Sequence, residues 1–353
     1  MSLVNINLAT VGMDKMSRLK VLKPHLIAFI RHMTFKKMYN FILAEMNQIM
    51  KREINSAYPY ILKIESTNIC NLKCGYCYDS RRLPVSGERA YGRMSLDDFK
   101  KIVDEVGPYL FKINLYGFGE PLLFPETFEM VKYATQKNIG VGISSNMNID
   151  TPHLAENIIE SGLEVLIFSC HGISKDTYSR FMGKGDFELA LKNIKTLTQK
   201  RRKSGAKNPL IDWQFCVTKF NQDEIQQAVK IQKEYGIDQI RFIRPDVPAE
   251  ADAEWISDLF PKRSITFDDP VGCSWPYRSA YVNFDGGLLP CCRDTRRLSN
   301  DFGNVFEQNI STIWNNEKYK NSRRLIANSN NKIDCETMCN ECPALGFETQ
   351  SKK

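Results

Sequence analysis

Hydrophobic positions along the middle of the chain follow two alternating spacings. Short runs rich in β-branched and aromatic residues are separated by longer segments whose apolar residues recur every three or four positions. The predicted strands cover residues 60–65, 111–116, 140–144, 164–169, 211–217 and 239–243. This alternation predicts an α/β fold in which parallel strands are linked by covering helices, as an open sheet or as a partial barrel.

The helices predicted between these strands have recognisable starts. Ser95 stands before Asp98 at the spacing of a capping box, and Thr151 precedes Pro152, which suits a first helical turn. Further helices are predicted over residues 126–136, 187–203, 222–235 and 311–327. Ligands of parallel α/β folds collect at the carboxyl ends of the strands, so the loops that follow each strand are the expected functional region.

The N-terminal fifty residues combine a helical pattern with excess positive charge. The spacing predicts one helix over residues 18–50, with Pro24 in a first-turn position. Its apolar stripe comprises Met38, Phe41, Ile42, Met46 and Ile49. Residues 1–52 hold nine Lys and Arg and two acidic residues, and this excess equals the net charge of +7 of the whole chain. Such a local surplus argues against a protein that coats nucleic acid.

Three interpretations remain open for this basic segment. It packs across the barrel as a structural cover, it presents Lys and Arg to an anionic membrane surface or a phosphorylated carrier, or it docks a partner protein.

Composition narrows the class of protein. The chain has 353 residues, of which 42% are hydrophobic and 25% charged, as in soluble globular proteins of two or three domains. No apolar run approaches the roughly 18 residues that cross a bilayer, and no signal peptide opens the chain. We therefore expect a cytoplasmic protein, with peripheral contact to a membrane as the alternative.

Eleven cysteines are unusual for such a chain. Without a secretion signal, cysteine groups indicate metal ligands or redox centres more than disulfides. Cys170 and Cys216 stand apart within strand-like runs, where we expect small buried side chains. The others form an early group of Cys70, Cys74 and Cys77 and a late group of Cys273, Cys291, Cys292, Cys335, Cys339 and Cys342.

The early group lies in the loop after the first predicted strand. Three thiolates match structural zinc poorly, because zinc usually takes four ligands, but they suit a cubane iron–sulfur cluster with one iron left open. Zinc that borrows a distant fourth cysteine remains the alternative from spacing alone.

The loop after the second strand adds a ligand-binding pattern. Gly117 and Gly119 permit close approach of the backbone to a ligand, and Glu120, followed by Pro121, can accept hydrogen bonds from an ammonium group.

Together these motifs resemble those of the radical S-adenosylmethionine (SAM) enzymes. The match covers about residues 59–245, with Gly119-Glu120-Pro121 in place of the family's Gly-Gly-Glu-Pro and Phe118 in place of a glycine. The resemblance implies a partial (β/α)6 barrel and a [4Fe–4S] cluster on Cys70, Cys74 and Cys77, whose open iron chelates SAM. The implied SAM-binding residues are Tyr76, Gly117, Gly119, Glu120, Pro121, Ser145, Asn146 and Ser169.

Two details refine this resemblance. Glu120 is expected at the methionyl ammonium and Tyr76 against the adenine. His171 stands where related sequences have an acid, and we interpret it as a turn residue held by the backbone. The implied chemistry is reductive cleavage of SAM to a 5′-deoxyadenosyl radical that abstracts a substrate hydrogen, with an electron donor such as flavodoxin or ferredoxin.

The C-terminal cysteines resemble the SPASM/twitch extension of radical SAM enzymes. A hairpin with its turn at residues 285–287 leads to Cys291. The resemblance implies one auxiliary [4Fe–4S] cluster on Cys273, Cys291, Cys339 and Cys342, and the metal would stabilise a segment with little apolar periodicity. Zinc at these four cysteines, and a second cluster involving Cys292 and Cys335, are the alternatives. The predicted domains are a basic helical extension over residues 1–57, the barrel over 58–250 and the auxiliary domain over 251–353.

The reaction predicted from these parts is a two-electron oxidation, with the auxiliary cluster as electron acceptor. A small molecule, a saccharide or a lipid-linked substrate is favoured, because no β-rich leader-binding domain is recognised. Gln214 is a candidate substrate contact and Asp246 a candidate base. The alternatives are a peptide maturase that forms a cross-link, and a non-catalytic electron carrier or zinc-stabilised binding protein.

Overall fold

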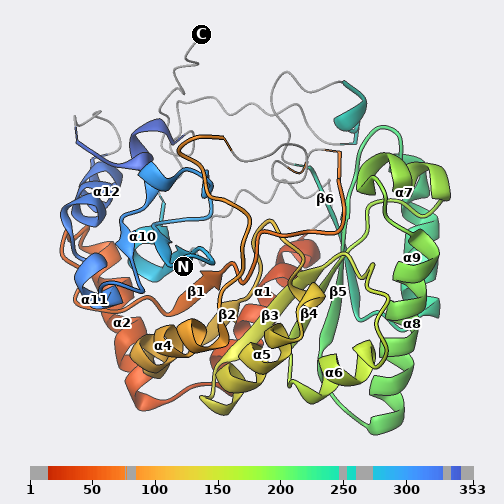
Figure 1. Cartoon of the computed structure of the whole chain (residues 1–353), viewed down its shortest axis with the longest axis horizontal. Helices are drawn as coiled ribbons and strands as arrows, with labels where there is room; N and C mark the ends of the chain where they lie inside the picture. Colours follow the sequence, from red (N-terminus) through yellow and green to blue (C-terminus); the bar gives the residue numbers. More distant parts are fainter. Residues whose placement is uncertain are drawn as a thin grey trace.

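The computed structural model describes residues 15–75, 77, 85–245, 253–259, 273–328 and 335–342, and only the backbone of residues 15–22. A nine-stranded sheet in the order β6-β5-β4-β3-β2-β1-β7-β8-β9 organises the molecule (Figure 1). The strands are β1 (Ile61–Ile64), β2 (Lys112–Asn114), β3 (Gly140–Ser145), β4 (Val165–Ser169), β5 (Leu210–Cys216), β6 (Gln239–Ile243), β7 (Ser279–Val282), β8 (Gly287–Leu289) and β9 (Gly303–Asn304).

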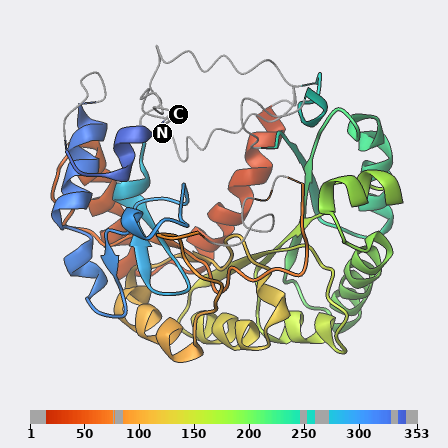
Figure 2. The same ribbon diagram turned by 45° about the horizontal axis from the view of Figure 1, so that its top comes forward.

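Strands β1 to β6 form the predicted partial barrel. Each pairs in parallel with the next in chain order, which places all their carboxyl ends at the same edge. Figure 2 shows the sheet curving, with its connecting helices on the outer side. These are α4 (Leu96–Val106), α5 (Glu126–Gln136), α6 (Leu154–Glu160), α7 (Lys175–Met182), α8 (Phe187–Ser204) and α9 (Ile225–Glu234).

Helix α4 shows how the sequence pattern produces this packing. The Ser95 side chain accepts a hydrogen bond from the Asp98 amide, which confirms the predicted helix start. Its apolar residues, spaced for one face, are buried against the sheet: Phe99, Ile102, Val103 and Val106. The predicted start at Thr151 is wrong, because α6 begins at Leu154 after His153 in a left-handed conformation.

The N-terminal segment forms two helices rather than the single predicted one. Helix α1 (Lys15–Arg31) ends before Thr34, whose side chain accepts a 3.2 Å hydrogen bond from the Lys37 amide and caps α2 (Phe35–Ile49). Pro24 lies inside α1 rather than in its first turn. Helix α1 lies inside the curve of the sheet, in contact with β2 and β6 (Figure 2), so the interpretation as a structural cover is supported.

Part of the apolar stripe predicted from the sequence of α2 is exposed to solvent. Its buried residues are Lys37, Asn40, Ala44 and Asn47, whereas Ile42, Met46 and Ile49 of the predicted apolar stripe are exposed. Asn40 exchanges two hydrogen bonds with the backbone of Tyr58, at 3.0 and 2.8 Å. These buried amides satisfy the backbone of the segment that leads into β1. Ala44 and Phe41 pack beside them against Tyr60 and Phe111, so α2 buries a face of mixed polar and apolar residues.

The C-terminal segment extends the same sheet. Strand β7 pairs in parallel with β1, and β8 and β9 follow antiparallel, with Gly286 at φ +88° in the predicted hairpin turn. Its helices are α10 (Trp275–Arg278), α11 (Ile310–Ile313) and α12 (Glu317–Ala327), so the helix predicted over residues 311–327 is interrupted. The hydrophobic core of the barrel continues into this segment through Val282, Leu288 and Trp314, so packing supports it alongside any metal.

Candidate functional site

The loops after β1, β2 and β3 meet at Asn146. Its backbone amide donates a 2.7 Å hydrogen bond to Oε2 of Glu120 in the second loop. Its side-chain amide donates to Oδ1 of Asn71 at 3.0 Å and to Sγ of Cys70 at 3.9 Å, both in the first loop. The motif residues, which are far apart in sequence, are therefore brought together at the carboxyl ends of the strands.

The cysteine loop is folded so that its thiols are close to backbone donors. The Leu72 amide donates to Sγ of Cys70 at 3.4 Å, and the Cys77 amide donates to the carbonyl of Cys74 at 3.3 Å. Burial raises the pKa of Cys70 to about 12, with Glu120 and Cys77 adding negative charge nearby. An iron cluster would supply positive charge that stabilises three thiolates, so the donor set fits such a group.

The glycines of the second loop allow close contacts that a side chain would block. A Cβ at Gly119 would lie 2.2 Å from the carbonyl oxygen of Thr67, and a Cβ at Gly117 would lie 2.2 Å from Oε1 of Glu65. The Glu120 amide donates to the carbonyl of Ile69 at 2.9 Å. The predicted glycines thus hold the second loop directly against the cysteine loop.

Glu120 is a buried carboxylate of this region, with 2% of its surface exposed. Burial raises its pKa to about 7, and hydrogen bonds from the amides of Asn146 and Leu122 limit that rise. A carboxylate so poorly solvated gains from an ammonium partner, which is the role expected for it. Pro121, next in the chain, begins the short helix whose first amide, from Leu122, binds Glu120.

The serines at the ends of β3 and β4 differ in how far they are buried. The Oγ atoms of Ser144 and Ser169 lie 3.0 Å apart and both side chains are half-buried. Ser145 is buried, and its hydroxyl accepts a 3.0 Å hydrogen bond from the Met147 amide. Tyr76 and Asp246 lie outside the described residues.

His171 has the structural role expected of it. Burial lowers its pKa to about 3, so the imidazole is neutral. Its Nδ1 accepts a 3.1 Å hydrogen bond from the Cys216 amide, and its carbonyl accepts one from the Asn221 side chain.

Sequence reasoning missed two charged residues, Lys63 in β1 and Glu65 directly after it. Glu65 accepts a 2.8 Å hydrogen bond from the Phe118 amide, and Lys63 has its ammonium 4.8 Å from the ring centre of Tyr116 and 5.8 Å from that of Tyr281. The period-two spacing of Lys63 and Glu65, between buried Leu62 and Ile64, was the available signal. These residues connect the glycine loop to the C-terminal strand β7.

The late cysteines also gather. Cys339 is buried with Leu325, and Cys273, Cys335 and Cys342 pack against them. Burial raises the pKa of Cys291 well above its usual value, and the nearby thiols of Cys339 and Cys273 contribute to the rise. Among the described residues no three potential ligands are close enough for a single metal ion. A cubane places each thiolate on a different iron, so its ligands need not be that close.

Two family models match the chain, and each covers one of the two cysteine groups. The model of the radical SAM superfamily matches residues 64–211, and that of the SPASM iron–sulfur cluster-binding domain matches residues 273–343. The chain belongs to the radical SAM superfamily and carries a SPASM domain. The radical SAM domain implies a [4Fe–4S] cluster with SAM, and the SPASM domain implies auxiliary iron–sulfur binding.

Curated relatives of this radical SAM protein are named for different functions. It is 24% identical over 299 residues to the tungsten-containing aldehyde ferredoxin oxidoreductase cofactor-modifying protein of Pyrococcus furiosus, covering 73% of this chain and 81% of that protein. It is 30% identical to the AdoMet-dependent heme synthase of Methanosarcina barkeri and to the mycofactocin maturase MftC of Mycolicibacterium smegmatis. Those two matches cover 50% of this chain and only 48% and 43% of the relatives.

Solved structures support the fold of the radical SAM protein. Streptococcus suis SuiB bound to S-adenosylmethionine matches with a TM-score of 0.61 and 16% identity, over 85% of this chain and 74% of that one. The enzyme anSMEcpe with bound AdoMet matches with a TM-score of 0.53 and 16% identity, over 76% of this chain and 84% of that one.

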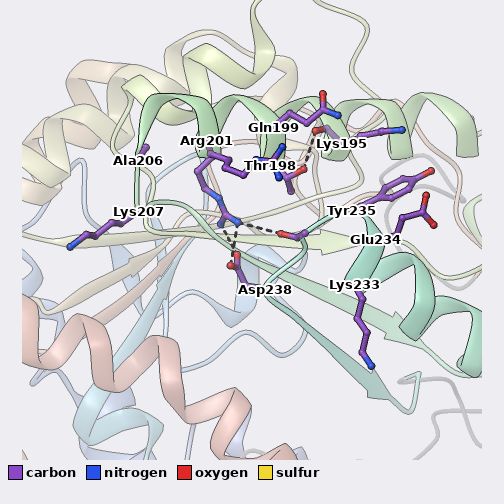
Figure 3. A pocket seen from close by; sticks show the side chains of 12 residues that line it. Lys195, Thr198, Gln199, Arg201, Ala206, Lys207, Lys233, Glu234, Tyr235 and Asp238 are labelled. Carbon is purple, nitrogen blue, oxygen red and sulfur yellow. Dashed lines mark hydrogen bonds and ion pairs between the residues drawn. The ribbon is translucent and has the colours of Figure 1, made fainter.

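Figure 3 shows a surface pocket of about 580 Å³, and neither cysteine group contributes to its lining. It is formed by the C-terminal parts of α8 and α9, and Arg201 crosses it to pair with Asp238 at 2.6 Å. It contains none of the predicted site residues.

Proposed function

We propose that this chain catalyses a SAM-dependent radical oxidation of its substrate. The 5′-deoxyadenosyl radical would take one hydrogen atom from the substrate, and the substrate radical would then lose a proton and pass one electron to the auxiliary cluster. The observation that carries the proposal is the Asn146 junction, which joins the three-cysteine loop to the buried carboxylate of Glu120. A separate group of four cysteines in the SPASM domain supports the second half of the proposal.

The first cluster, when bound, supplies the electron that cleaves SAM to methionine and a 5′-deoxyadenosyl radical. Cys70, Cys74 and Cys77 would hold that cluster. Glu120 would bind the methionyl ammonium through the carboxylate oxygens that already accept from Asn146 and Leu122. The contribution of the protein is to position SAM and to exclude water and other hydrogen donors from the site.

The interior of the barrel suits a polar substrate. Nε of Arg241 donates to both carboxylate oxygens of Asp212, at 2.9 and 2.7 Å, and its guanidinium also reaches Oε1 of Gln214 at 3.3 Å. Lys63 brings a further ammonium from β1. These groups offer directed hydrogen bonds to hydroxyl, amide or carboxylate groups. Asp246 remains the candidate base from sequence.

A peptide maturase is the second candidate, because one relative and one structural neighbour favour it. One relative at 30% identity is a mycofactocin maturase, and SuiB is also known bound to a precursor peptide. A non-catalytic electron carrier accounts less well for the site, since a carrier has no need of a carboxylate such as Glu120.

The test is anaerobic. The protein loaded with iron and sulfide is reduced, through flavodoxin or ferredoxin as the proposed donors or with dithionite, and SAM is added. We expect formation of 5′-deoxyadenosine and methionine. A protein that carries both clusters, is reduced, and leaves SAM intact would instead be an electron carrier. Genomic neighbours then supply candidate small molecules and peptides, and transfer of deuterium from a labelled candidate into 5′-deoxyadenosine identifies the substrate class.

A further inference from the structure

Exposed apolar side chains are concentrated in one part of the described chain. Of fourteen large hydrophobic residues that are exposed, ten lie between residues 26 and 54. We call these ten residues the apolar face: Leu26, Ile30, Met33, Phe35, Tyr39, Ile42, Met46, Ile49, Met50 and Ile54. Phe35 is 99% exposed and Ile49 is 79% exposed. Apolar exposure concentrated in one segment in this way is typical of a site of interaction.

The apolar face follows helical geometry. Phe35, Tyr39, Ile42, Met46 and Ile49 recur at intervals of four and three along α2. Leu26, Ile30 and Met33 have the same intervals at the end of α1 and the turn that follows. Each helix therefore presents one apolar stripe to solvent, and Met33 and Phe35 lie at the joint between them.

The opposite side of these helices is fixed against the protein by apolar packing, which includes Phe29 and Phe41 against Phe111, and by polar contacts. The His32 ring contacts Oε1 of Glu164 and Oδ1 of Asn138, each at 2.9 Å. Lys37 is buried and donates to the carbonyl of Asn138. Asn47 is also buried and donates to Oδ1 of Asn55 at 2.8 Å. The exposure of the apolar face is thus built into the fold by specific polar contacts on the opposite side.

The joint between α1 and α2 lies at the opposite end of the barrel from the candidate site. Asn138 and Glu164 immediately precede β3 and β4, at their amino ends. The motif loops follow the carboxyl ends of β1, β2 and β3. A partner bound at the joint would leave the mouth of the barrel accessible.

The charge around the apolar face is positive. Lys23, Lys36 and Arg52 are exposed in this segment, as are Arg31, which pairs with Glu164 at 2.6 Å, and Lys51, which donates to the Ala327 carbonyl at 3.2 Å. The acidic residues there are engaged within the protein, since Glu45 pairs with Arg278 and Glu53 pairs with Arg324 at 2.7 Å. A surface that combines exposed aromatic and aliphatic residues with lysine and arginine complements an anionic lipid surface.

We propose that the apolar face docks the protein on the surface of an anionic phospholipid bilayer. The described helices include none with the length and apolar character needed to cross a membrane, so α2 would lie in the interface. A symmetric pair of chains would instead bring two basic segments together, each from the region that holds the whole net charge of +7. The proposal does not depend on the reaction that the site catalyses.

The test is flotation of the full-length protein with lipid vesicles under anaerobic conditions. One set is phosphatidylcholine alone and the other contains phosphatidylglycerol. The variant combines Phe35→Ser, Tyr39→Ser and Ile42→Ser, all at exposed positions. The matched control is Leu298→Ser, which changes an exposed hydrophobic residue outside the apolar face.

We expect wild-type protein and the control to bind the anionic vesicles at least about tenfold more tightly than the neutral ones, with binding weakened by salt. The triple variant should lose about tenfold or more in affinity while its thermal midpoint stays unchanged. Equal binding by the triple variant would overturn the proposal. Absence of vesicle binding would also overturn it, and a wild-type dimer that the triple variant dissociates would show that a second copy covers the face.

Discussion

The two cysteine groups of this chain are assembled in different ways. The first lies within residues 70–77, so a single loop after β1 brings three thiols together. The second draws Cys273, Cys291 and the pair Cys339 and Cys342 from three separate segments, with Cys335 packed beside them, and β7 and β8 extend the sheet from β1 to carry these segments. The first group is local and has three members, whereas the second depends on the fold and can supply at least four.

This difference indicates a division of labour. Three thiolates on a four-iron cluster leave one iron for a ligand from solution, and the neighbouring Glu120 suits the ammonium of such a ligand. Four thiolates leave none, so the second group suits electron transfer and stabilisation of its segment. Variants in each group should therefore have distinct effects.

The largest expected effect follows from Cys74→Ala. Loss of one of three ligands should remove the first cluster, so iron falls from about eight to about four per chain and formation of 5′-deoxyadenosine drops to background. Iron analysis and chromatography of the nucleoside measure both. The matched control is Cys170→Ala, a buried cysteine outside both groups, which should retain iron and SAM cleavage. Full SAM cleavage by Cys74→Ala would exclude this loop as the site.

Cys339→Ala should have the opposite effect, with loss of the auxiliary cluster and retention of the first one. We expect the loss of about four irons and a lower thermal midpoint, because metal binding contributes to the stability of this segment. SAM cleavage should stay within about tenfold of the wild-type rate, since the first loop is untouched. The control is Cys292→Ala at an exposed cysteine. Complete loss of SAM cleavage with the first cluster intact would contradict separate roles.

Glu120→Gln tests the link between the first cluster and SAM. Removing the charge should weaken SAM binding by about 10- to 100-fold, the range of a charge-assisted hydrogen bond, with iron content unchanged. Calorimetric titration of SAM into the iron-loaded protein measures this change. An unchanged affinity would show that Glu120 supports only the loops.

The pKa of Glu120 adds a dependence on pH in SAM-free protein. Its pKa of about 7 lies above the ordinary value of 4.5, so the folded state binds the proton more tightly than the unfolded state. The stability of wild type relative to Glu120→Gln should therefore fall as the pH rises from about 4.5 to about 7, by at most about 3 kcal/mol. Denaturant unfolding of both proteins at pH 5 and pH 8 measures this difference, and an identical difference at both pH values would contradict it.

Glu65→Gln has the smallest expected effect. It tests whether the contact between the glycine loop and β7 supports SAM binding alone or both regions. Glu65 accepts from the Phe118 amide, and both Glu65 and Tyr281 of β7 lie against Gly117. The variant keeps its size but weakens that hydrogen bond, so we expect a loss of about three- to tenfold in SAM affinity. Both clusters should be retained. A loss of iron from the SPASM domain would show that Glu65 supports both regions.

The sequence predicted the fold well because the barrel arises from local patterns. All six strands occur where their apolar runs indicated, and α5 has the predicted bounds of residues 126–136. The early cysteines and the glycine loop were equally visible, since each motif is short and follows a strand.

Features that depend on the tertiary fold escaped prediction. The periodicity of α2 indicated a helix with an apolar stripe, yet buried Asn40 and Asn47 bind the segment before β1 and direct that stripe outward. Lys63 and Glu65 became visible as site residues only once β7 was paired with β1. Periodicity defines a helix face, but the partner of that face comes from distant parts of the chain.

The central claim is that SAM binds the iron that Cys70, Cys74 and Cys77 leave without a protein ligand. Magnetic resonance tests this claim most directly. SAM labelled with nitrogen-15 in its amino group is added to the reduced, iron-loaded protein, and hyperfine coupling to the cluster is recorded. We expect coupling between the labelled nitrogen and the cluster in wild type and in Cys339→Ala, and no such coupling in Cys74→Ala. A cluster spectrum that labelled SAM leaves unchanged in the wild-type protein would contradict it.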